Sequence, residues 1–198
     1  SMGGFKRIGW WVLVGAVAVG MLIPAPGASS EAIGPPEEGG VLPDVKLTLP
    51  DPAAHQQYLG VGAEGSFKIP QVRAELVILE IFSMYCPYCQ KEAPVVNELY
   101  RLISGNPDLK DRVKIVGIGA GNTSFEVATF QKQFSVPFPL VPDNDLNLHR
   151  TFGDVRTPYF IVIRMMQDGS HQVIYSKAGA FGDPQEFLNL LLSKGKRN

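Results

Sequence analysis

Residue types that would point to a metal site or a nucleic-acid-binding surface are scarce in this sequence. The chain of 198 residues has two cysteines and three histidines, His55, His149 and His171. A structural zinc site takes four closely spaced Cys or His ligands, so scattered histidines and one cysteine pair disfavour zinc. The formal net charge is -1, and the longest basic stretch is Lys194-Gly195-Lys196-Arg197. Because nucleic-acid binding needs a concentrated cationic surface, we expect no nucleic-acid partner.

Apolar side chains, by contrast, are plentiful. Hydrophobic residues make up 45% of the chain and charged residues 19%. A chain of this length can bury roughly 70% of the surface that it exposes when unfolded, which is enough for a core without structural disulfides or metals. No internal repeat is visible. The composition therefore predicts one globular domain.

The N-terminal segment is typical of membrane targeting. Lys6 and Arg7 precede an uncharged apolar run over residues 8–23, and prolines end the run. We predict a signal peptide or an N-terminal membrane anchor over residues 1–28. The small residues of Ala28-Ser29-Ser30 favour cleavage, but the anchor stays open. In either case the positive charges place the rest of the chain outside the cytoplasm, in the periplasm or on the outer face of the membrane. Any contact with the membrane is expected through this segment alone.

The next segment, residues 29–44, is rich in Pro, Gly and acidic residues and is predicted to be a flexible linker. The folded domain is expected over residues 45–198. Its apolar patterns alternate between strand and helix periods, which predicts an α/β fold with a central mixed sheet flanked by helices. The expected strands are 45–49, 65–69, 76–82, 113–118, 138–141, 159–163 and 172–175, and the expected helices begin at residues 87, 124, 146 and 184.

Both cysteines lie in the sequence Cys86-Pro87-Tyr88-Cys89, where a buried strand meets a helix. The free N–H groups and the dipole at a helix N-terminus stabilise an anion, so the Cys86 thiolate should be favoured over the thiol. Cys89 lies one turn into the helix and is suited to resolving a mixed disulfide. A purely structural disulfide is disfavoured, because it would close too short a loop to constrain the unfolded chain.

These features resemble the thioredoxin superfamily, and within it the exported TlpA/ResA-like thiol-disulfide oxidoreductases. The apolar strand 76–82 leads into the Cys86–Cys89 motif, and Pro94 follows Cys89 by five residues. Thr157-Pro158 precedes a strand, as in the family's cis-proline loop. Residues 113–152 match the added strand-helix unit of TlpA-like domains, and the match covers residues 45–194.

The resemblance implies a thioredoxin-like fold with an N-terminal β extension and an inserted strand-helix unit. It implies that Thr157 and a cis Pro158 bind the substrate backbone; a trans turn at a strand entry is the alternative for Pro158. Glu80 lies six residues before Cys86, where many thioredoxins keep a buried acid. In an apolar strand its pKa should rise, which makes it a candidate general acid/base. An edge-strand glutamate that reaches water is the alternative.

The residues around the cysteines depart from the usual pattern. Tyr85 replaces a tryptophan, and Pro87-Tyr88 is typical of glutaredoxins, which leaves the redox potential open. We expect Tyr85, Pro87 and Tyr88 to contact substrate. Tyr85 and Tyr88 could form an exposed apolar rim, or Tyr85 could pack in the core.

The predicted function is an extracytoplasmic thiol-disulfide oxidoreductase that reduces disulfides in exported proteins, as in cytochrome c maturation. Its partners would be those proteins and a membrane electron donor of the thiol-disulfide type, and it would need no cofactor or metal beyond the Cys86–Cys89 couple. A disulfide-introducing oxidase is the main alternative. A peroxiredoxin-like peroxidase fits less well, because Ser83 matches its pattern but Leu79 stands where a proline is needed. A copper-handling module would need three residues between its cysteines.

Overall fold

The computed structural model describes Gly3 and residues 34–196. The predicted targeting segment, residues 1–28, thus lies outside the described residues apart from Gly3. None of the helices in the described part of the chain is long and apolar enough to cross a membrane.

The centre of the fold is a five-stranded mixed sheet with the order β5-β4-β3-β6-β7. β3 pairs in parallel with β4 and antiparallel with β6, so it lies in the middle of the sheet. All seven of its residues are buried, as expected for a continuous aliphatic run with a layer on each face. The strands are β3 (Leu76–Phe82), β4 (Val113–Ala120), β5 (Leu140–Asp143), β6 (Tyr159–Met165) and β7 (His171–Ala178).

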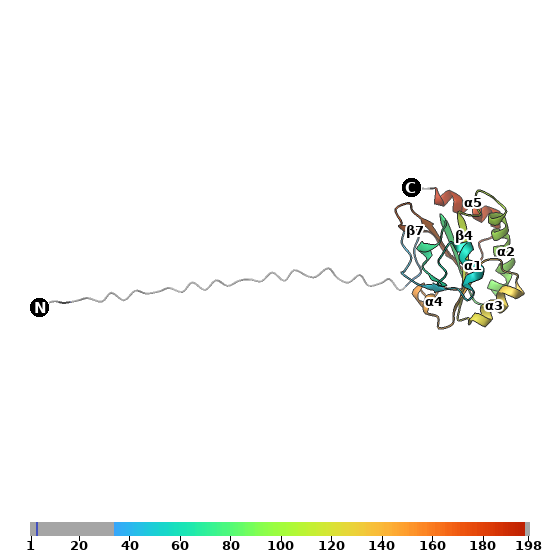
Figure 1. Ribbon diagram of the computed structural model, residues 1–198, viewed down its shortest axis with the longest axis horizontal. Helices are drawn as coiled ribbons and strands as arrows, with labels where there is room; N and C mark the ends of the chain where they lie inside the picture. The colour runs from blue at the N-terminus through green and yellow to red at the C-terminus, as the bar shows by residue number, and fades with distance from the viewer. Residues whose placement is uncertain (1–2, 4–33, 197–198) are drawn as a thin grey trace. The chain divides into compact units, whose positions relative to one another are not determined.

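Helices cover both faces of this sheet. Figure 1 shows α2, α3 and α5 along one side of it. Their apolar side chains form one core cluster with the β3 residues Ile78 and Phe82, while Val77 and Leu79 point into a second cluster on the opposite face. The helices are α1 (Pro52–Leu59), α2 (Pro87–Ser104), α3 (Ser124–Gln133), α4 (Asn147–Thr151) and α5 (Pro184–Gly195).

Several helix starts follow from local sequence. The Thr123 side chain accepts from the backbone N–H of Glu126, and the Glu126 carboxylate accepts from the N–H of Thr123, which together form a capping box. The Asp183 side chain accepts from the N–H of Glu186 and so caps α5, with Pro184 at the first position of the helix. The buried face of α2 includes Val96, Leu99 and Ile103.

The β extension before the main sheet is smaller than expected and contains an extra helix. β1 (Leu47–Thr48) and β2 (Ser66–Phe67) form a two-stranded antiparallel sheet. Between them lies α1, a helix that is not predicted from the sequence. Asp51 caps α1 and Gly60 ends it in a left-handed conformation. This helix could not be predicted from apolar periodicity, because Leu59 is its one buried residue and the helix therefore has no apolar stripe.

Of the predicted linker over residues 29–44, residues 29–33 lie outside the described residues, and residues 34–44 are packed on the domain, contrary to the prediction. The backbones of Gly39 and Gly40 exchange hydrogen bonds of 2.8 Å with Val173 on β7. The N–H of Leu42 donates to Nε2 of His171 at 3.0 Å, and the Leu42 side chain is buried. The packed domain therefore begins before residue 45. A high content of Pro, Gly and Glu is typical of a flexible linker. Here, however, the backbones of Gly39 and Gly40 pair with the edge strand β7.

Candidate active site

Cys86 is the N-cap residue of α2, at the end of the loop that follows β3. Two side chains hold this loop through Met84. Asn122 accepts the N–H of Met84 at 2.9 Å, and the side-chain amide of Gln90 donates to its carbonyl oxygen at 2.8 Å. Cys86 is partly exposed and its sulfur is free. The predicted position of this thiol at a helix N-terminus is thus confirmed.

The surroundings of Cys86 favour its thiolate. Partial burial acts to raise the pKa of the Cys86 thiol, but hydrogen bonds from the Thr157 side chain and from Cys89 outweigh it and lower the pKa overall. A further contribution comes from the backbone N–H of Tyr88, in the first turn of α2. The backbone N–H groups of Tyr88 and Cys89 are among the free N–H groups that make a helix N-terminus stabilise an anion.

Cys89 has the opposite character. Its side chain is fully buried in the core cluster beneath α2. Burial raises the pKa of the Cys89 thiol well above its ordinary value, and the nearby charge of Glu80 acts in the same direction. The motif therefore contains one accessible, acidified thiol and one buried, protonated thiol.

Glu80 lies on the central strand β3, so it is not an edge-strand glutamate that reaches water. It is 3% exposed, and its cross-strand neighbours are Gly117 on β4 and Phe160 on β6. One of its carboxyl oxygens has no hydrogen-bond partner. Burial, with a smaller effect from Glu92, raises the pKa of Glu80 to about 8. A carboxyl group in this state can hold or release a proton near neutral pH.

Glu92 is a second acid of the site, and the sequence reasoning missed it. It lies three residues after Cys89 on α2, which places both side chains on one face of the helix. Glu92 is 5% exposed, and its carboxylate accepts the N–H of Phe181 at 3.3 Å. Burial raises the pKa of Glu92. Its spacing from Cys89 is the signal that could have identified it.

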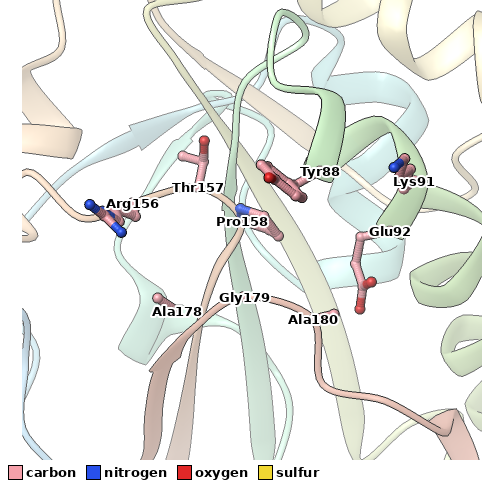
Figure 2. A pocket seen from close by; sticks show the side chains of 9 residues that line it. All are labelled: Tyr88, Lys91, Glu92, Arg156, Thr157, Pro158, Ala178, Gly179 and Ala180. Atoms are coloured by element: carbon pink, nitrogen blue, oxygen red, sulfur yellow. The ribbon is translucent and has the colours of Figure 1, made fainter.

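The peptide bond between Thr157 and Pro158 is cis, as predicted. In its thiol form Cys86 donates to the backbone carbonyl oxygen of Thr157 across 3.4 Å. A pocket of about 380 Å³ opens beside this contact (Figure 2). Its lining comes from α2, the cis-proline loop and the end of β7, namely Tyr88, Lys91, Glu92, Arg156, Thr157, Pro158, Ala178, Gly179 and Ala180.

Two tyrosines flank the reactive thiol at the surface. Tyr85 is 65% exposed and Tyr88 is 72% exposed, and Pro87 between the cysteines is exposed as well. Tyr85 donates a hydrogen bond from its hydroxyl group to Glu126 on α3. Of the two alternatives for Tyr85, the structure places it in the exposed rim and not in the core.

The structure thus gathers Cys86, Cys89, Glu80 and the cis-proline loop at one end of the sheet. Over Gly3 and residues 34–196, the His, Cys, Asp and Glu side chains form no group of three that could hold a metal ion. The chemistry that this arrangement supports is exchange between a dithiol and a disulfide.

Comparison with known proteins agrees with this geometry. The sequence profile of the AhpC/TSA family matches residues 39–175. The chain belongs to the AhpC/TSA family. This AhpC/TSA protein is 32% identical over 88 residues to the thiol-disulfide oxidoreductase ResA of Bacillus thuringiensis subsp. konkukian. The alignment covers 44% of this chain and 47% of that relative, so the chain spans about half the length of the curated relative it matches.

Solved structures confirm the thioredoxin-like α/β fold of this AhpC/TSA protein. A secreted thiol-disulfide isomerase from Corynebacterium glutamicum superposes with a TM-score of 0.56 at 17% identity, covering 79% of this chain and 86% of that one. StoA from Bacillus subtilis superposes with a TM-score of 0.53 at 18% identity, covering 75% and 98% of the two chains. The sequence similarity to ResA, together with the family match, confirms the resemblance to ResA-like proteins.

Proposed function

We propose that this protein is a thiol-disulfide oxidoreductase in which Cys86 attacks the substrate and Cys89 resolves the product. The observation that supports this most strongly is the asymmetry of the two thiols. The pKa of Cys86 is lowered and its sulfur is partly exposed, whereas Cys89 is buried and its pKa is raised. Since the thiolate is the nucleophile in disulfide exchange, Cys86 reacts first.

The reaction transfers two electrons from the Cys86–Cys89 dithiol to the substrate disulfide. The Cys86 thiolate forms a bond to one sulfur of the substrate disulfide, and the other substrate sulfur leaves as a thiolate. Cys89 loses its proton and attacks the Cys86 sulfur, which forms the Cys86–Cys89 disulfide and releases the second substrate thiolate. Glu80 would accept the Cys89 proton; its burial on β3 and the effect of its charge on that thiol support this role.

The direction that we propose is reduction of disulfides in exported proteins, including those of cytochrome c maturation. A dithiol donor in the membrane would then return the Cys86–Cys89 disulfide to the dithiol. The apolar run over residues 8–23 supports an extracytoplasmic location, and the similarity to ResA supports the redox chemistry. Thr157, Pro158, Tyr85, Pro87 and Tyr88 would contact the substrate.

One observation favours the reverse direction, in which the protein introduces disulfides. A lowered pKa for Cys86 stabilises the reduced dithiol, and this makes the corresponding disulfide a stronger oxidant. Burial of Cys89 and its raised pKa oppose the effect. The reduction potential of the couple therefore decides between reductase and oxidase.

The test is to equilibrate the full chain with thiol-disulfide buffers of defined potential and to count free thiols by mass. A midpoint near roughly -270 mV supports the reductase, and one near roughly -120 mV overturns it in favour of the oxidase. Cys89→Ser should trap a mixed disulfide on Cys86, whereas Cys86→Ser should trap none. If neither variant changes disulfide exchange, the proposed function is wrong.

A further inference from the structure

The pocket beside Cys86 is open because the backbone on one side of it has small side chains. Ala178, Gly179 and Ala180 form this side and are all exposed. Gly179 has a φ of +89°, and its N–H donates to the carbonyl oxygen of Pro158 at 2.8 Å. A Cβ added at Gly179 would meet nothing within 4 Å. The volume of about 380 Å³ is therefore available to part of a substrate.

The location of the pocket links it to the chemistry of Cys86. Thr157 contributes to the pocket lining, and its carbonyl oxygen contacts the Cys86 sulfur. A substrate cysteine in a mixed disulfide with Cys86 would lie next to Thr157, because it would be bonded to the Cys86 sulfur. Because consecutive Cα atoms are about 3.8 Å apart, a residue next to that cysteine lies within reach of the pocket.

Two cationic side chains line this pocket. Lys91 comes from α2 and Arg156 from the loop before β6, and both side chains are exposed. Figure 2 shows them on opposite sides, with Tyr88 and Pro158 between them. The one acid in the lining is Glu92, which is 5% exposed and whose carboxylate accepts from the N–H of Phe181. The accessible charge of the pocket is thus positive although the whole chain has a net charge of -1.

We propose that this pocket selects protein substrates that have an acidic residue next to the reactive cysteine. The stem of a glutamate would lie against Tyr88 and Pro158, and its carboxylate would reach Arg156 or Lys91. A basic residue in the same place would face two like charges, so the pocket both attracts one class of substrate and repels the other. This preference rests on the proposed disulfide exchange at Cys86.

The test uses self-quenched fluorescent peptide homodisulfides in which the cysteine is flanked by Glu, by Gln or by Lys. Each peptide is mixed with the reduced full chain, and the second-order rate constant is measured at low and high salt. We expect the Glu peptide to react several-fold faster than the Gln peptide, and the Lys peptide to react most slowly. High salt should reduce the difference, because the ion pairs are exposed.

Variants assign the preference to the two cations. Arg156→Gln and Lys91→Gln should each slow the Glu peptide by about threefold, and the double variant by about tenfold, with the Gln peptide changed by less than about twofold. Lys46→Gln is the matched control, since Lys46 is exposed and does not line the pocket.

The outcomes separate this preference from the proposed function. Equal rates for the three peptides, or a Glu preference that survives in the double variant, would overturn the acidic preference while disulfide exchange stands. If the reduced chain, with both thiols free, cleaves none of the peptides, the proposed exchange activity fails and the preference fails with it.

Discussion

Glu80 on the central strand and Glu92 on the active-site helix interact electrostatically beneath the cysteine motif. Burial is the larger cause of the raised pKa of Glu80, about 8, and the charge of Glu92 adds to it. Cys89 in turn has its pKa raised by burial and, to a lesser extent, by the charge of Glu80. The pKa of each of these three buried groups is therefore raised, and loss of a proton from one makes loss from the next more costly.

The first prediction concerns stability. Glu80 has a pKa of about 8 in the folded protein and an ordinary value near 4.5 when unfolded. Between these values unfolding releases a proton, so the contribution of Glu80 to stability is full below pH 4.5 and is lost as the pH rises toward 8. Glu80→Gln should remove most of this loss, which is on the order of a few kcal/mol. Urea unfolding from pH 5 to pH 8 measures it.

Glu64→Gln is the control for that experiment, because Glu64 is an exposed acid far along the chain from the motif. It should leave the pH dependence of unfolding unchanged. If the wild-type protein and Glu80→Gln lose stability equally between pH 5 and pH 8, Glu80 is not protonated in the folded state.

The second prediction concerns the step that depends on Cys89. If Glu80 accepts the Cys89 proton, Glu80→Gln should slow resolution of the mixed disulfide by about tenfold or more, while the first attack by Cys86 changes little. Single-turnover kinetics with a fluorescent mixed disulfide separate the two steps. The pH profile of resolution should lose its inflection near pH 8. An unchanged profile would remove Glu80 from the mechanism.

The parts of the site that short sequence motifs encode could be predicted, whereas the parts that depend on contacts between distant residues could not. The positions of Cys86, Cys89 and the cis Pro158 follow from short motifs at a strand-helix junction and a strand entry, and the structure agrees with each. Glu92 was missed, because a single glutamate on a helix looks like a solvent-exposed residue until its neighbours in space are known. Phe181, whose N–H binds it, lies 89 residues away in sequence.

The fold was predictable to a similar extent. The strand over residues 76–82 was found with its bounds because every position is apolar except Glu80. The edge segment over residues 34–44 was not, because its contacts with β7 use backbone groups and leave no apolar pattern. Tyr85 is exposed and donates a hydrogen bond to Glu126, 41 residues away in sequence. A pattern of neighbouring residues does not predict such a tertiary contact.

The third prediction assigns a positioning role to Asn122. This fully buried side chain accepts the N–H of Met84, two residues before Cys86. Asn122→Ala should cost about 1–3 kcal/mol, because it leaves that N–H without its acceptor. It should also shift the pH profile of Cys86 alkylation, since the loop would hold the sulfur less firmly over the α2 N-terminus.

Asn106→Ala serves as the comparison, because Asn106 also accepts a backbone N–H, that of Asp108, but in an exposed turn. This variant should leave the alkylation profile of Cys86 unchanged. A loss of stability in Asn122→Ala with no change in that profile would make Asn122 structural only.

The fourth prediction tests where the domain begins. A chain that starts at residue 34 keeps the backbone pairing of Gly39 with Val173, the buried Leu42 and the 2.6 Å ion pair of Lys194 with Glu38. A chain that starts at residue 45 loses all three. Burial of one leucine and the lost hydrogen bonds together predict a deficit of about 2–4 kcal/mol in the free energy of unfolding. Denaturant unfolding of the two chains side by side measures the difference, and equal midpoints would show that residues 34–44 add nothing to the fold. Leu42→Ala in the longer chain should reproduce part of the deficit, because it removes apolar contact with the core while leaving the backbone pairing in place.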